Sequence, residues 1–558
     1  MKLLILESPN KVKTLYKLLP DGFDVIASVG HITHIPPDKM NINVSDGLFR
    51  PVIKPVPGKL NIMRAIRDKA ASCDEVFICT DPDREGERIA WDILCLIKDK
   101  SKVKRAEFHE ITKKAVTKAV ANPRELDMDM VNSQFTRQIL DRLIGYTVSP
   151  MLWKNVREAK SAGRVQSVAL RLVAEREFEI ESFTPEVFWD IPVTFKIGKE
   201  EVEGIVVTKD QKNRIDDVEV ANLAKKFIEE SKPIVKTVVS KMMDRSPKPP
   251  FDTASLQKQA SSTFGWSGKK TMEVAQKVYE AGYCTYHRTD SFVVSDEAYE
   301  SCKEFIESEY GPNYVPETRP VYSKKSRSQE AHECIRPTSM SGASWVEGND
   351  LGKDEQALYD MIRSRFIASQ MASMKIEKTT VIVGCGKCNV VVEGKSVKFD
   401  GWSIMSSLQG KEVFLPKIEK GDVLELVNVY VKEHSTRPSD RFNDGTLVSK
   451  MEKEGVGRPS TWAVLVDTLL ERGYVTKEGK NFKLTYTGRK VYEFLMSKFD
   501  TFFMDIGFTS AMEDELENIS QGESDRLKVI RDFYSRLDEL INAERNEAWA
   551  RLSGQLSD

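Results

Sequence analysis

Four carboxylate side chains lie where two apolar segments end. Glu7 follows the apolar residues 3–6, and Asp81, Asp83 and Glu85 follow the run EVFICT at residues 75–80. If both runs are neighbouring strands of a parallel sheet, their carboxyl ends meet at one edge and bring Glu7 close to Asp81 and Asp83. Carboxylate oxygens are the ligands that Mg²⁺ prefers in proteins. Glu7, Asp81 and Asp83 are therefore candidate magnesium ligands; a solvated acidic loop that caps the next helix is the alternative.

A second group surrounds Tyr286. The pattern predicts a helix over residues 268–281 that stops at Gly282, followed by YCTYHRTDS in an extended form. Tyr286 and Arg288 then project to the same side. A tyrosine oxygen can attack a phosphodiester and form a covalent phosphotyrosine, and a guanidinium can hold the phosphate with two hydrogen bonds. The alternative is an ordinary strand aromatic that packs in a core.

The segment SQEAHECIRPT contains His332 and Arg336. Histidine can move a proton near neutral pH, which is useful in phosphoryl transfer. A structural hydrogen bond is the more common role of a single histidine, and the segment alone leaves both readings open.

Basic and aromatic residues interleave between residues 137 and 166. Trp153, Lys154, Arg157 and Lys160 precede the small residues of SAGRVQS, which open a predicted helix. A single-strand groove needs positive charge for the backbone and aromatic rings for base stacking. A helix N-terminus behind small residues is a good seat for phosphate. The alternative is an exposed basic helix face.

Residues 454–488 are predicted to form a turn, a helix and a hairpin, like a winged-helix unit. The segment GRPS at residues 457–460 places Arg458 and a helix N-terminus where they can face phosphate. A purely structural helical unit is the alternative.

The elements that position these residues change in type along the chain. Strand and helix alternate up to about residue 115, which predicts a parallel sheet covered by helices. Helical patterns follow to residue 181, and strand-rich segments occupy residues 187–239 and 379–431. The stretch between them and the C-terminal part are mainly helical. This order predicts one β domain that the chain enters and leaves, with a separate domain at its tip.

The composition is that of a globular protein with several domains. The chain has 558 residues, 40% of them hydrophobic and 30% charged, and a net charge of −2. No apolar run approaches the ~18 residues of a membrane span, and the first residues lack a secretory cleavage site. Cys385 and Cys388 are the only close cysteine pair, so no four-thiolate zinc site is expected. A nucleic-acid-binding protein of this net charge must concentrate its positive charge locally.

In this order, the motifs resemble the type IA DNA topoisomerase family, in its topoisomerase I branch. They are ESPNKVKT, SVGHI, DPDREGERIAW, SAGRVQS, YEAGYCTYHRTDS, QEAHECIRPT and GRPSTWA, and the match extends to FTSAMEDELENI near Phe508. The GRPST segment favours this branch over the topoisomerase III branch. The resemblance implies a multidomain α/β plus α and β fold: a Toprim α/β domain, a helical winged-helix-like domain, a strand-rich arch and a tyrosine-bearing domain that together form a toroid.

The resemblance also implies roles for individual residues. Tyr286 corresponds to the nucleophile that becomes joined to the 5′ phosphate, and Glu7, Asp81 and Asp83 to the Toprim Mg²⁺ site, with Arg84 and Glu85 in support. Arg288 and Lys11 correspond to positive groups around the scissile phosphate, and His332 to a histidine near the active site; Glu7 also counts among the catalytic residues. The expected DNA contacts are His31, Arg137, Gln138, Asp141, Tyr146, Trp153, Ser161, Ala162, Gly163, Arg164, Val165, Gln166, Arg288 and Arg458.

The activity that the resemblance implies is relaxation of negatively supercoiled DNA by single-strand cleavage, strand passage and religation. No G-x-x-x-x-G-K-[ST] loop is found, so ATP is not expected to take part. We expect a monomer that binds single-stranded or underwound DNA, contacts no membrane, is not secreted, and lies in the cytoplasm or on DNA in a nucleoid or viral factory. The expected domains are 1–120 (Toprim), 121–185 (helical, first part), 186–250 (arch, first part), 251–375 (catalytic tyrosine domain), 376–432 (arch, second part) and 433–558 (helical, second part).

One departure from the family and two other functions bear on this prediction. Many family members carry zinc-binding cysteine modules after this core, and none is expected here, which leaves strand-passage efficiency and partner binding open. A Toprim nuclease or primase-like enzyme shares the acidic residues but has no use for Tyr286. A catalytically silent DNA-binding protein has no need of Tyr286, Arg288 and the acidic set together. A covalent protein–DNA adduct and a plasmid relaxation assay separate these functions.

Overall fold

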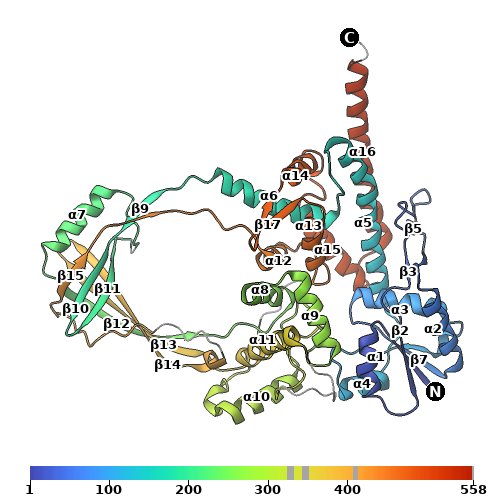
Figure 1. The fold of residues 1–558 in the computed structure, drawn as a ribbon, viewed down its shortest axis with the longest axis horizontal. Helices are drawn as coiled ribbons and strands as arrows, with labels where there is room; N and C mark the ends of the chain where they lie inside the picture. Colours follow the sequence, from blue (N-terminus) through green and yellow to red (C-terminus); the bar gives the residue numbers. More distant parts are fainter. Residues whose placement is uncertain (211, 323–331, 342–350, 406–411, 556–558) are drawn as a thin grey trace.

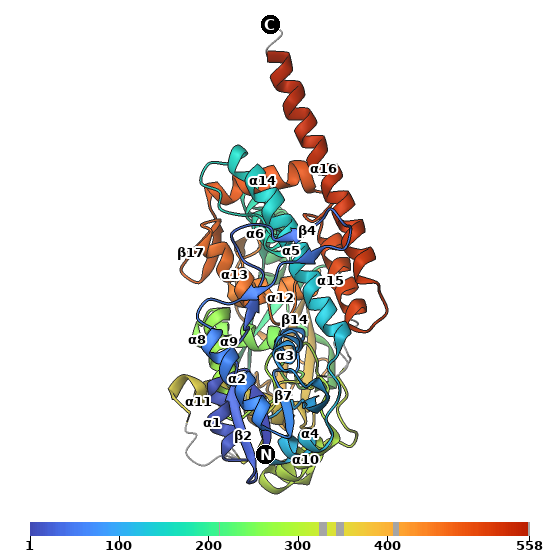
Figure 2. The ribbon, with the colours of Figure 1, turned by 90° about the vertical axis from the view of Figure 1, so that its right-hand side faces the viewer.

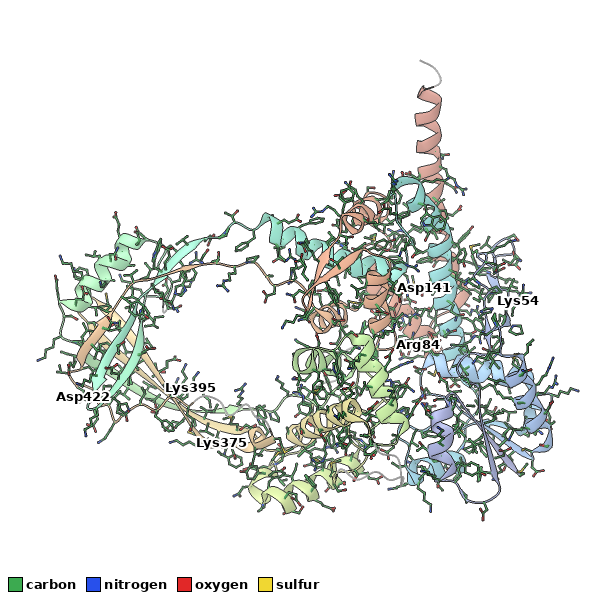
Figure 3. All side chains as sticks on the ribbon, viewed as in Figure 1. Lys54, Arg84, Asp141, Lys375, Lys395 and Asp422 are labelled. Carbon is green, nitrogen blue, oxygen red and sulfur yellow. The ribbon has the colours of Figure 1, made fainter. Side chains whose placement is uncertain are left out.

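The protein is a ring attached to a compact α/β unit (Figure 1). The computed structural model describes residues 1–210, 212–322, 332–341, 351–405 and 412–555. A strand-rich arch encloses a wide opening together with two mainly helical units, and the side chains drawn in Figure 3 leave that opening clear. No helix within the described residues is both long and apolar enough to cross a membrane. The toroid expected from the sequence is therefore present, whereas the exact domain boundaries stay predictions.

The N-terminal unit is built on a parallel sheet with the strand order β2-β1-β7-β8. Apolar side chains fill both faces of its central strands, because helices cover both sides, as expected for a parallel sheet. Its elements are β1 (Lys2–Leu6), α1 (Pro9–Tyr16), β2 (Phe23–Ala27), α2 (Leu60–Ser72), β7 (Glu75–Cys79), α3 (Arg84–Leu96), β8 (Val103–Arg105) and α4 (Lys113–Ala121).

An insertion at residues 31–58 leaves this unit as two short ribbons. They pair β3 (Thr33–His34) with β6 (Lys54–Pro55), and β4 (Ile42–Asn43) with β5 (Arg50–Pro51). Ile42 and Phe49 of the insertion are buried in the core of the helical unit, not in their own sheet. The insertion therefore ties the N-terminal unit to the helical unit, and the sequence analysis did not anticipate it.

The helical unit stands above the N-terminal unit and combines two distant parts of the chain (Figure 2). The first part is α5 (Met128–Asn155) and α6 (Arg164–Ser182). The second part is α12 (Asp444–Lys453), α13 (Trp462–Glu471), β17 (Val475–Glu478), β18 (Asn481–Leu484), α14 (Tyr486–Phe499), α15 (Ile506–Ser520) and α16 (Arg526–Gln555). The helix and hairpin expected within residues 454–488 are α13 and the β17–β18 pair.

The arch is a six-stranded sheet with two extended connections to the helical unit. Its strand order is β12-β13-β14-β11-β10-β15, and a separate pair, β9 with β16, carries the chain in and out. The strands are β9 (Val187–Asp190), β10 (Pro192–Ile197), β11 (Glu200–Val207), β12 (Ile234–Arg245), β13 (Met374–Cys385), β14 (Cys388–Phe399), β15 (Glu425–Val429) and β16 (Lys432–Ser435). One helix, α7 (Val218–Glu229), lies where the sequence indicated mainly strand.

The tyrosine unit is inserted between β12 and β13, at the end of the arch. It contains α8 (Thr253–Phe264), α9 (Gly268–Glu280), α10 (Asp296–Tyr310) and α11 (Lys353–Ser369). Only the arch connects this unit covalently to the rest of the chain, while α8 and α9 pack noncovalently against α12 and α13 of the helical unit.

Candidate active site

The acidic residues leave neighbouring strands at one edge of the N-terminal sheet. β1 and β7 are parallel and adjacent, with Leu6 opposite Cys79, so Glu7 and Asp81 emerge side by side. Asp83 caps α3 by accepting the Gly86 amide at 2.8 Å. Residue 86 must be glycine, because a Cβ there would lie 2.0 Å from the Asp81 carbonyl oxygen. The tight β7–α3 turn thus fixes where the carboxylates point.

Tyr286 reaches this edge from the tyrosine unit. Its hydroxyl donates a hydrogen bond to Asp83 Oδ2 at 2.6 Å, and its peptide N–H donates to the His109 carbonyl at 2.7 Å. The side chain is only 2% exposed. The segment that carries it consists of turns and isolated bridges instead of the extended strand expected, and it leaves α9 through Gly282, whose φ is +85°. Tyr286 and Asp83 therefore join two units of the protein at one hydrogen bond.

Two cations accompany the carboxylates. Lys11, on the first turns of α1, forms a buried ion pair with Asp81, and its Nζ lies 5.0 Å from the centre of the Tyr279 ring. Arg288 Nη1 lies 3.8 Å from Asp83 Oδ2, on the same side as the Tyr286 hydroxyl. Both positive groups expected around a scissile phosphate are therefore in the site.

Burial and like charge shift the pKa values of the site. Burial, together with the charge of Asp81, raises the pKa of Glu7 to about 7, although Lys11 opposes the shift. Burial raises the pKa of Tyr286 well above its ordinary value; Asp83 and Asp81 add to the shift, while Arg288 opposes it. Tyr286 is therefore a neutral phenol in this arrangement and needs a proton acceptor to become a nucleophile.

His332 lies against the same turn. Its Nε2 donates to the Pro82 carbonyl at 2.6 Å, and its ring centre is 6.1 Å from that of Tyr286. The preceding part of its motif, residues 328–331, lies outside the described residues. Arg336, three residues past Glu333, pairs with Glu333 and with Glu110 of the N-terminal unit. His332 therefore enters the site, and Arg336 serves the contact between the two units.

The three candidate magnesium ligands fit the metal by donor type and charge. Glu7, Asp81 and Asp83 offer hard carboxylate oxygens at one edge, and burial together with the charge of Asp81 raises the pKa of Glu7. Within the described residues, no three acidic, histidine or cysteine side chains already stand as a ready-made ligand set. Asp81 is turned to Lys11 and Asp83 to Tyr286, so metal binding requires these side chains to reorient.

The residues expected to contact DNA extend along α5 into the start of α6. His31 and Gln134 both reach Glu85, at 3.1 and 3.0 Å, beside the acidic edge. Arg137 lies 3.9 Å from Asp141, one turn further along α5. Gln138 is next to it, and its side-chain oxygen is buried without a hydrogen-bond partner within the described residues.

Two of the expected contacts have structural partners. The Tyr146 hydroxyl donates to the Pro37 carbonyl at 2.5 Å, so it anchors the insertion at residues 31–58. Trp153 is 56% exposed, yet its Nε1 donates to the Lys160 carbonyl at 2.7 Å and orients the ring. Trp153 remains available for stacking, whereas the hydroxyl of Tyr146 is occupied.

The SAGRVQS segment is held rigidly ahead of α6. The Tyr474 hydroxyl accepts from the Ser161 amide at 2.9 Å and donates to the Ser161 carbonyl at 2.8 Å. Gly163 is the N-cap of α6. Ala162, Arg164 and Val165 are buried, and Gln166 Nε2 donates to the Ser161 carbonyl at 3.4 Å. Of the residues in this segment, Ser161, Gly163 and Gln166 are therefore the partly exposed ones.

Four arginines line a small cavity of about 40 Å³ beside Tyr286, where the N-terminal, tyrosine and helical units meet. They are Arg84, Arg137, Arg288 and Arg458, and the carboxylates Asp83, Glu85 and Asp290 line the same cavity. A larger groove of about 810 Å³ adjoins the cavity at Arg288 and runs between Glu7, α9 and α13. The N-terminal ends of α3 and α13 face this junction, which adds positive potential to it.

Sequence reasoning missed the acidic residues that pair with these arginines. Glu513, Asp514 and Glu517 on α15 contact Arg164, Arg458 and Arg84, respectively. They lie in the FTSAMEDELENI segment that carries part of the resemblance, but their i, i+1, i+4 spacing is typical of a solvated helix face and gave no role to any of them. Tyr279 and His287, which pack against Tyr286, were also missed, because nothing in their spacing distinguishes them from core residues.

Comparisons with known proteins agree with this arrangement. A family model for DNA topoisomerase matches residues 125–531, and a model for the Toprim domain matches residues 2–111. DNA topoisomerase 1 of Zymomonas mobilis is 39% identical over 556 residues. The match covers 96% of this chain but 45% of that relative. DNA topoisomerase 1 of Aquifex aeolicus is 38% identical over 548 residues, which cover 96% of this chain and 98% of the relative.

A solved structure extends the comparison to the fold. Full-length topoisomerase I from Thermotoga maritima superimposes with a TM-score of 0.86 at 33% sequence identity, over 97% of this chain and 90% of that one. The matched family models, the relatives and the shared fold leave one assignment: the chain belongs to the type IA DNA topoisomerases, in their topoisomerase I branch.

Proposed function

We propose that this protein relaxes negatively supercoiled DNA without ATP, by cutting one strand with Tyr286, passing DNA through the gap and resealing it. The observation that carries the proposal is the 2.6 Å hydrogen bond from the Tyr286 hydroxyl to Asp83, which brings a tyrosine and the Toprim carboxylates together from separate units. A nuclease that activates water has no need of a buried tyrosine at that place. The substrate we propose is single-stranded or underwound DNA.

The proposed cleavage is a transesterification. The Tyr286 oxygen forms a bond to the phosphorus of a DNA phosphodiester while the bond from phosphorus to the 3′ oxygen breaks. Asp83, which already accepts the phenol hydrogen bond, takes the phenol proton, and the 3′ oxygen takes up a proton and leaves as a hydroxyl. Religation is the reverse. One P–O bond forms for each that breaks, so no nucleotide hydrolysis is required.

The positive groups of the site support the transferred phosphate. Arg288 lies beside Tyr286 and Asp83 and is placed to offset the charge that develops on the phosphate oxygens. Lys11 is held next to it by Asp81, and it becomes free for phosphate if Asp81 turns towards a metal. His332 holds the Asp81–Asp83 turn through the Pro82 carbonyl.

We propose Mg²⁺ as the cofactor, held by Glu7, Asp81 and Asp83. When bound, the metal would orient phosphate oxygens and the 3′ hydroxyl and offset their charge. The carboxylates have a role with and without the metal. In the form described here they position Lys11 and Tyr286, and once those partners leave they supply oxygen ligands.

We also propose that the strand lies along α5 and the start of α6. The exposed ring of Trp153 suits base stacking, and the partly exposed residues of SAGRVQS suit backbone contacts at the α6 N-terminus. The strand then enters the site past the four arginines. The remaining expected contacts, including His31, Gln138, Asp141 and Tyr146, adjoin this path or support it.

The test is plasmid relaxation with Mg²⁺ and no ATP, together with capture of a covalent adduct on a 3′-labelled single-stranded oligonucleotide. Wild-type protein should relax the plasmid and retain the label after denaturation. Tyr286→Phe should bind the oligonucleotide but yield neither product, because only the attacking oxygen is removed. Tyr359→Phe, which removes another buried hydroxyl of the same unit, is the matched control and should behave like wild type. An adduct formed by folded Tyr286→Phe protein would refute the proposal.

A further inference from the structure

The arginine-lined cavity contains more hydrogen-bond donors than the protein satisfies. Arg84 Nη1 and Arg458 Nε are both buried and have no hydrogen-bond partner within the described residues. The Arg84 side chain is 9% exposed and that of Arg458 is 11% exposed. Leaving a buried charged donor unpaired is unfavourable, and both arginines line the cavity, so an anion bound between their side chains would be stabilised.

The partners that these arginines do have come from one face of α15. Glu517 forms an ion pair with Arg84, and Asp514 Oδ1 lies 3.3 Å from Arg458 Nη2. Residues three apart on a helix are neighbours, so the two carboxylates stand next to each other above the cavity. Figure 3 shows Arg84 at the junction between the N-terminal and helical units, where α15 ends. Glu517 and Asp514 remain partly exposed, at 16% and 37%.

A third carboxylate on the same helix behaves differently. Glu513 contacts Arg164 at 2.7 Å, and both side chains are fully buried. Although burial alone would raise the pKa of Glu513, Arg164, Arg137 and Arg458 hold it far below its usual range. The surroundings of α15 are thus strongly positive. Glu513 is fully buried and has a structural role, whereas Asp514 and Glu517 are partly exposed.

We propose that the cavity between Arg84, Arg137, Arg288 and Arg458 seats one backbone phosphate of the bound strand, and that Glu517 and Asp514 occupy the arginines in the free protein and are displaced by that phosphate. The volume of about 40 Å³ has room for a few water-sized groups and therefore suits a small anion, not a nucleobase. α15 is then an internal competitor of DNA, and its acidic residues set how tightly the strand is held. This inference rests on the proposed function, because it assumes that a DNA strand enters the site.

The competition has a physical consequence for affinity. A phosphate that binds Arg84 must first break the Arg84–Glu517 pair and then lie near a carboxylate of the same sign. Replacing the carboxylate with an amide removes both effects but keeps the size of the side chain. If the pair only fastened α15 to α3, the same replacement would lower stability and leave strand affinity unchanged or weaker.

The experiment measures binding of a fluorescein-labelled oligo(dT) by anisotropy at several salt concentrations, in the Tyr286→Phe background so that no cleavage occurs. Glu517→Gln and Asp514→Asn are the test variants. Glu523→Gln, an exposed residue just beyond the same helix, is the control for a general change of net charge. We expect each test variant to bind about threefold to tenfold tighter, the scale of one charge-assisted contact, and the control to stay within about twofold. The difference should shrink as salt rises.

The outcomes separate the two levels of the proposal. If the Tyr286→Phe parent binds no oligonucleotide, the proposed function fails. If the parent binds, but both test variants with unchanged melting temperatures bind no tighter than Glu523→Gln, the counter-charge role of α15 is overturned. If Glu517→Gln melts early, Asp514→Asn decides, because its more exposed carboxylate contributes less to packing.

Discussion

At the residue scale, Asp83 has three partners that belong to three different tasks. Its carboxylate caps α3 through Gly86, accepts the Tyr286 hydroxyl, and attracts Arg288. Asp81, two residues earlier, holds Lys11. The two aspartates are therefore not equivalent: Asp83 holds the proposed nucleophile, Tyr286, and Asp81 holds Lys11, a proposed phosphate-binding cation.

A double change, Asp81→Asn with Asp83→Asn, should separate cleavage from the full cycle. It removes metal-binding charge and the proposed acceptor of the phenol proton but leaves Tyr286, Arg288 and Lys11, so adduct formation on single-stranded oligonucleotides should be slower but still detectable, with water taking the phenol proton. Plasmid relaxation should be lost, because orientation of the 3′ hydroxyl for resealing depends on the metal. An adduct gel and a relaxation assay, run beside thermal melting, measure this. Loss of both activities in parallel with loss of folded protein would contradict the prediction.

The buried Glu513–Arg164 pair should make stability depend on pH. Because the pKa of Glu513 is lowered in the folded state, its contribution is fully present above the ordinary carboxylate pKa and is lost as pH falls below it. Glu513→Gln leaves Arg164 buried without its partner, which costs about 3–5 kcal/mol. The melting temperature of the variant should lie well below that of wild type at pH 7.

The wild-type protein and the Glu513→Gln variant also provide the control for that prediction. Above the ordinary carboxylate pKa of 4.5 the gap in melting temperature should stay constant, and it should narrow as pH falls below that value, because only wild type loses the carboxylate contribution. A gap that stays constant or widens below that value would show that Glu513 contributes by shape and not by charge.

At the element scale, a helix or strand could be predicted from the sequence where the residue pattern of the segment identifies it and its packing partner lies nearby in the chain. The buried run EVFIC, the stop at Gly282 and the helix–hairpin order after Arg458 each predict an element that the structure contains. The meeting of Glu7 with Asp81 could also be predicted, because it needs only that two apolar strands are neighbours. The placement of Tyr286 against Asp83 followed from the family resemblance, since no local pattern links residues 203 positions apart.

Elements whose partners lie far away in sequence could not be predicted. The insertion at residues 31–58 has no strong apolar periodicity, and Phe49 is buried in the distant core of the helical unit, where its ring centre lies 5.4 Å from that of Tyr534 of α16. Helix α7 was hidden in a strand-rich context, although Asp217 caps it and Ala221 and Ile228 are buried in the core of the arch. The carboxylates of α15 were hidden for the same reason.

Phe49→Ala should therefore loosen the insertion without unfolding the sheet that bears it. A large-to-small change at a buried aromatic costs about 3–5 kcal/mol, and here the loss falls on the contact between the insertion and the helical unit. Limited proteolysis should cut within residues 31–58 sooner than in wild type. Val52→Ala, at a half-exposed position of the same insertion, should be neutral. Equal protease resistance in all three proteins would show that Phe49 does not anchor the insertion.

At the scale of the whole molecule, the ring has one place where it can open. The tyrosine unit is bonded to the arch on both sides but touches the N-terminal and helical units only through noncovalent contacts. Several of these contacts are polar, such as Lys269 with Asp467 at 2.9 Å and Asn10 with Glu280 at 3.0 Å. The junction also has an apolar part, because Leu6 and Ile111 of the N-terminal unit belong to the same buried cluster as Val278 and Tyr279 of the tyrosine unit.

A disulfide across this contact should lock the ring. A Cβ built on Gly268 of α9 lies 3.6 Å from the Cβ of Ala463 of α13, which is within disulfide range. Oxidised Gly268→Cys/Ala463→Cys protein should lose plasmid relaxation, because the tyrosine unit can no longer leave the helical unit, and a reducing agent should restore it. Each single cysteine variant is the control and should be insensitive to oxidant. Full relaxation by the cross-linked protein would mean that the ring opens elsewhere.

The hydrogen bond between Tyr286 and Asp83 links chemistry to the shape of the ring. Since the two residues belong to units that separate when the ring opens, the complete site exists only in the closed population, and the observed cutting rate is the intrinsic rate multiplied by the closed fraction. In the proposed cycle, the 5′ end travels with Tyr286 after a cut, while the 3′ end stays with the opposite unit. The site stays incomplete until the two ends return together. While the gap is open, neither water nor another hydroxyl group therefore encounters a complete site, and the phosphotyrosine bond does not react.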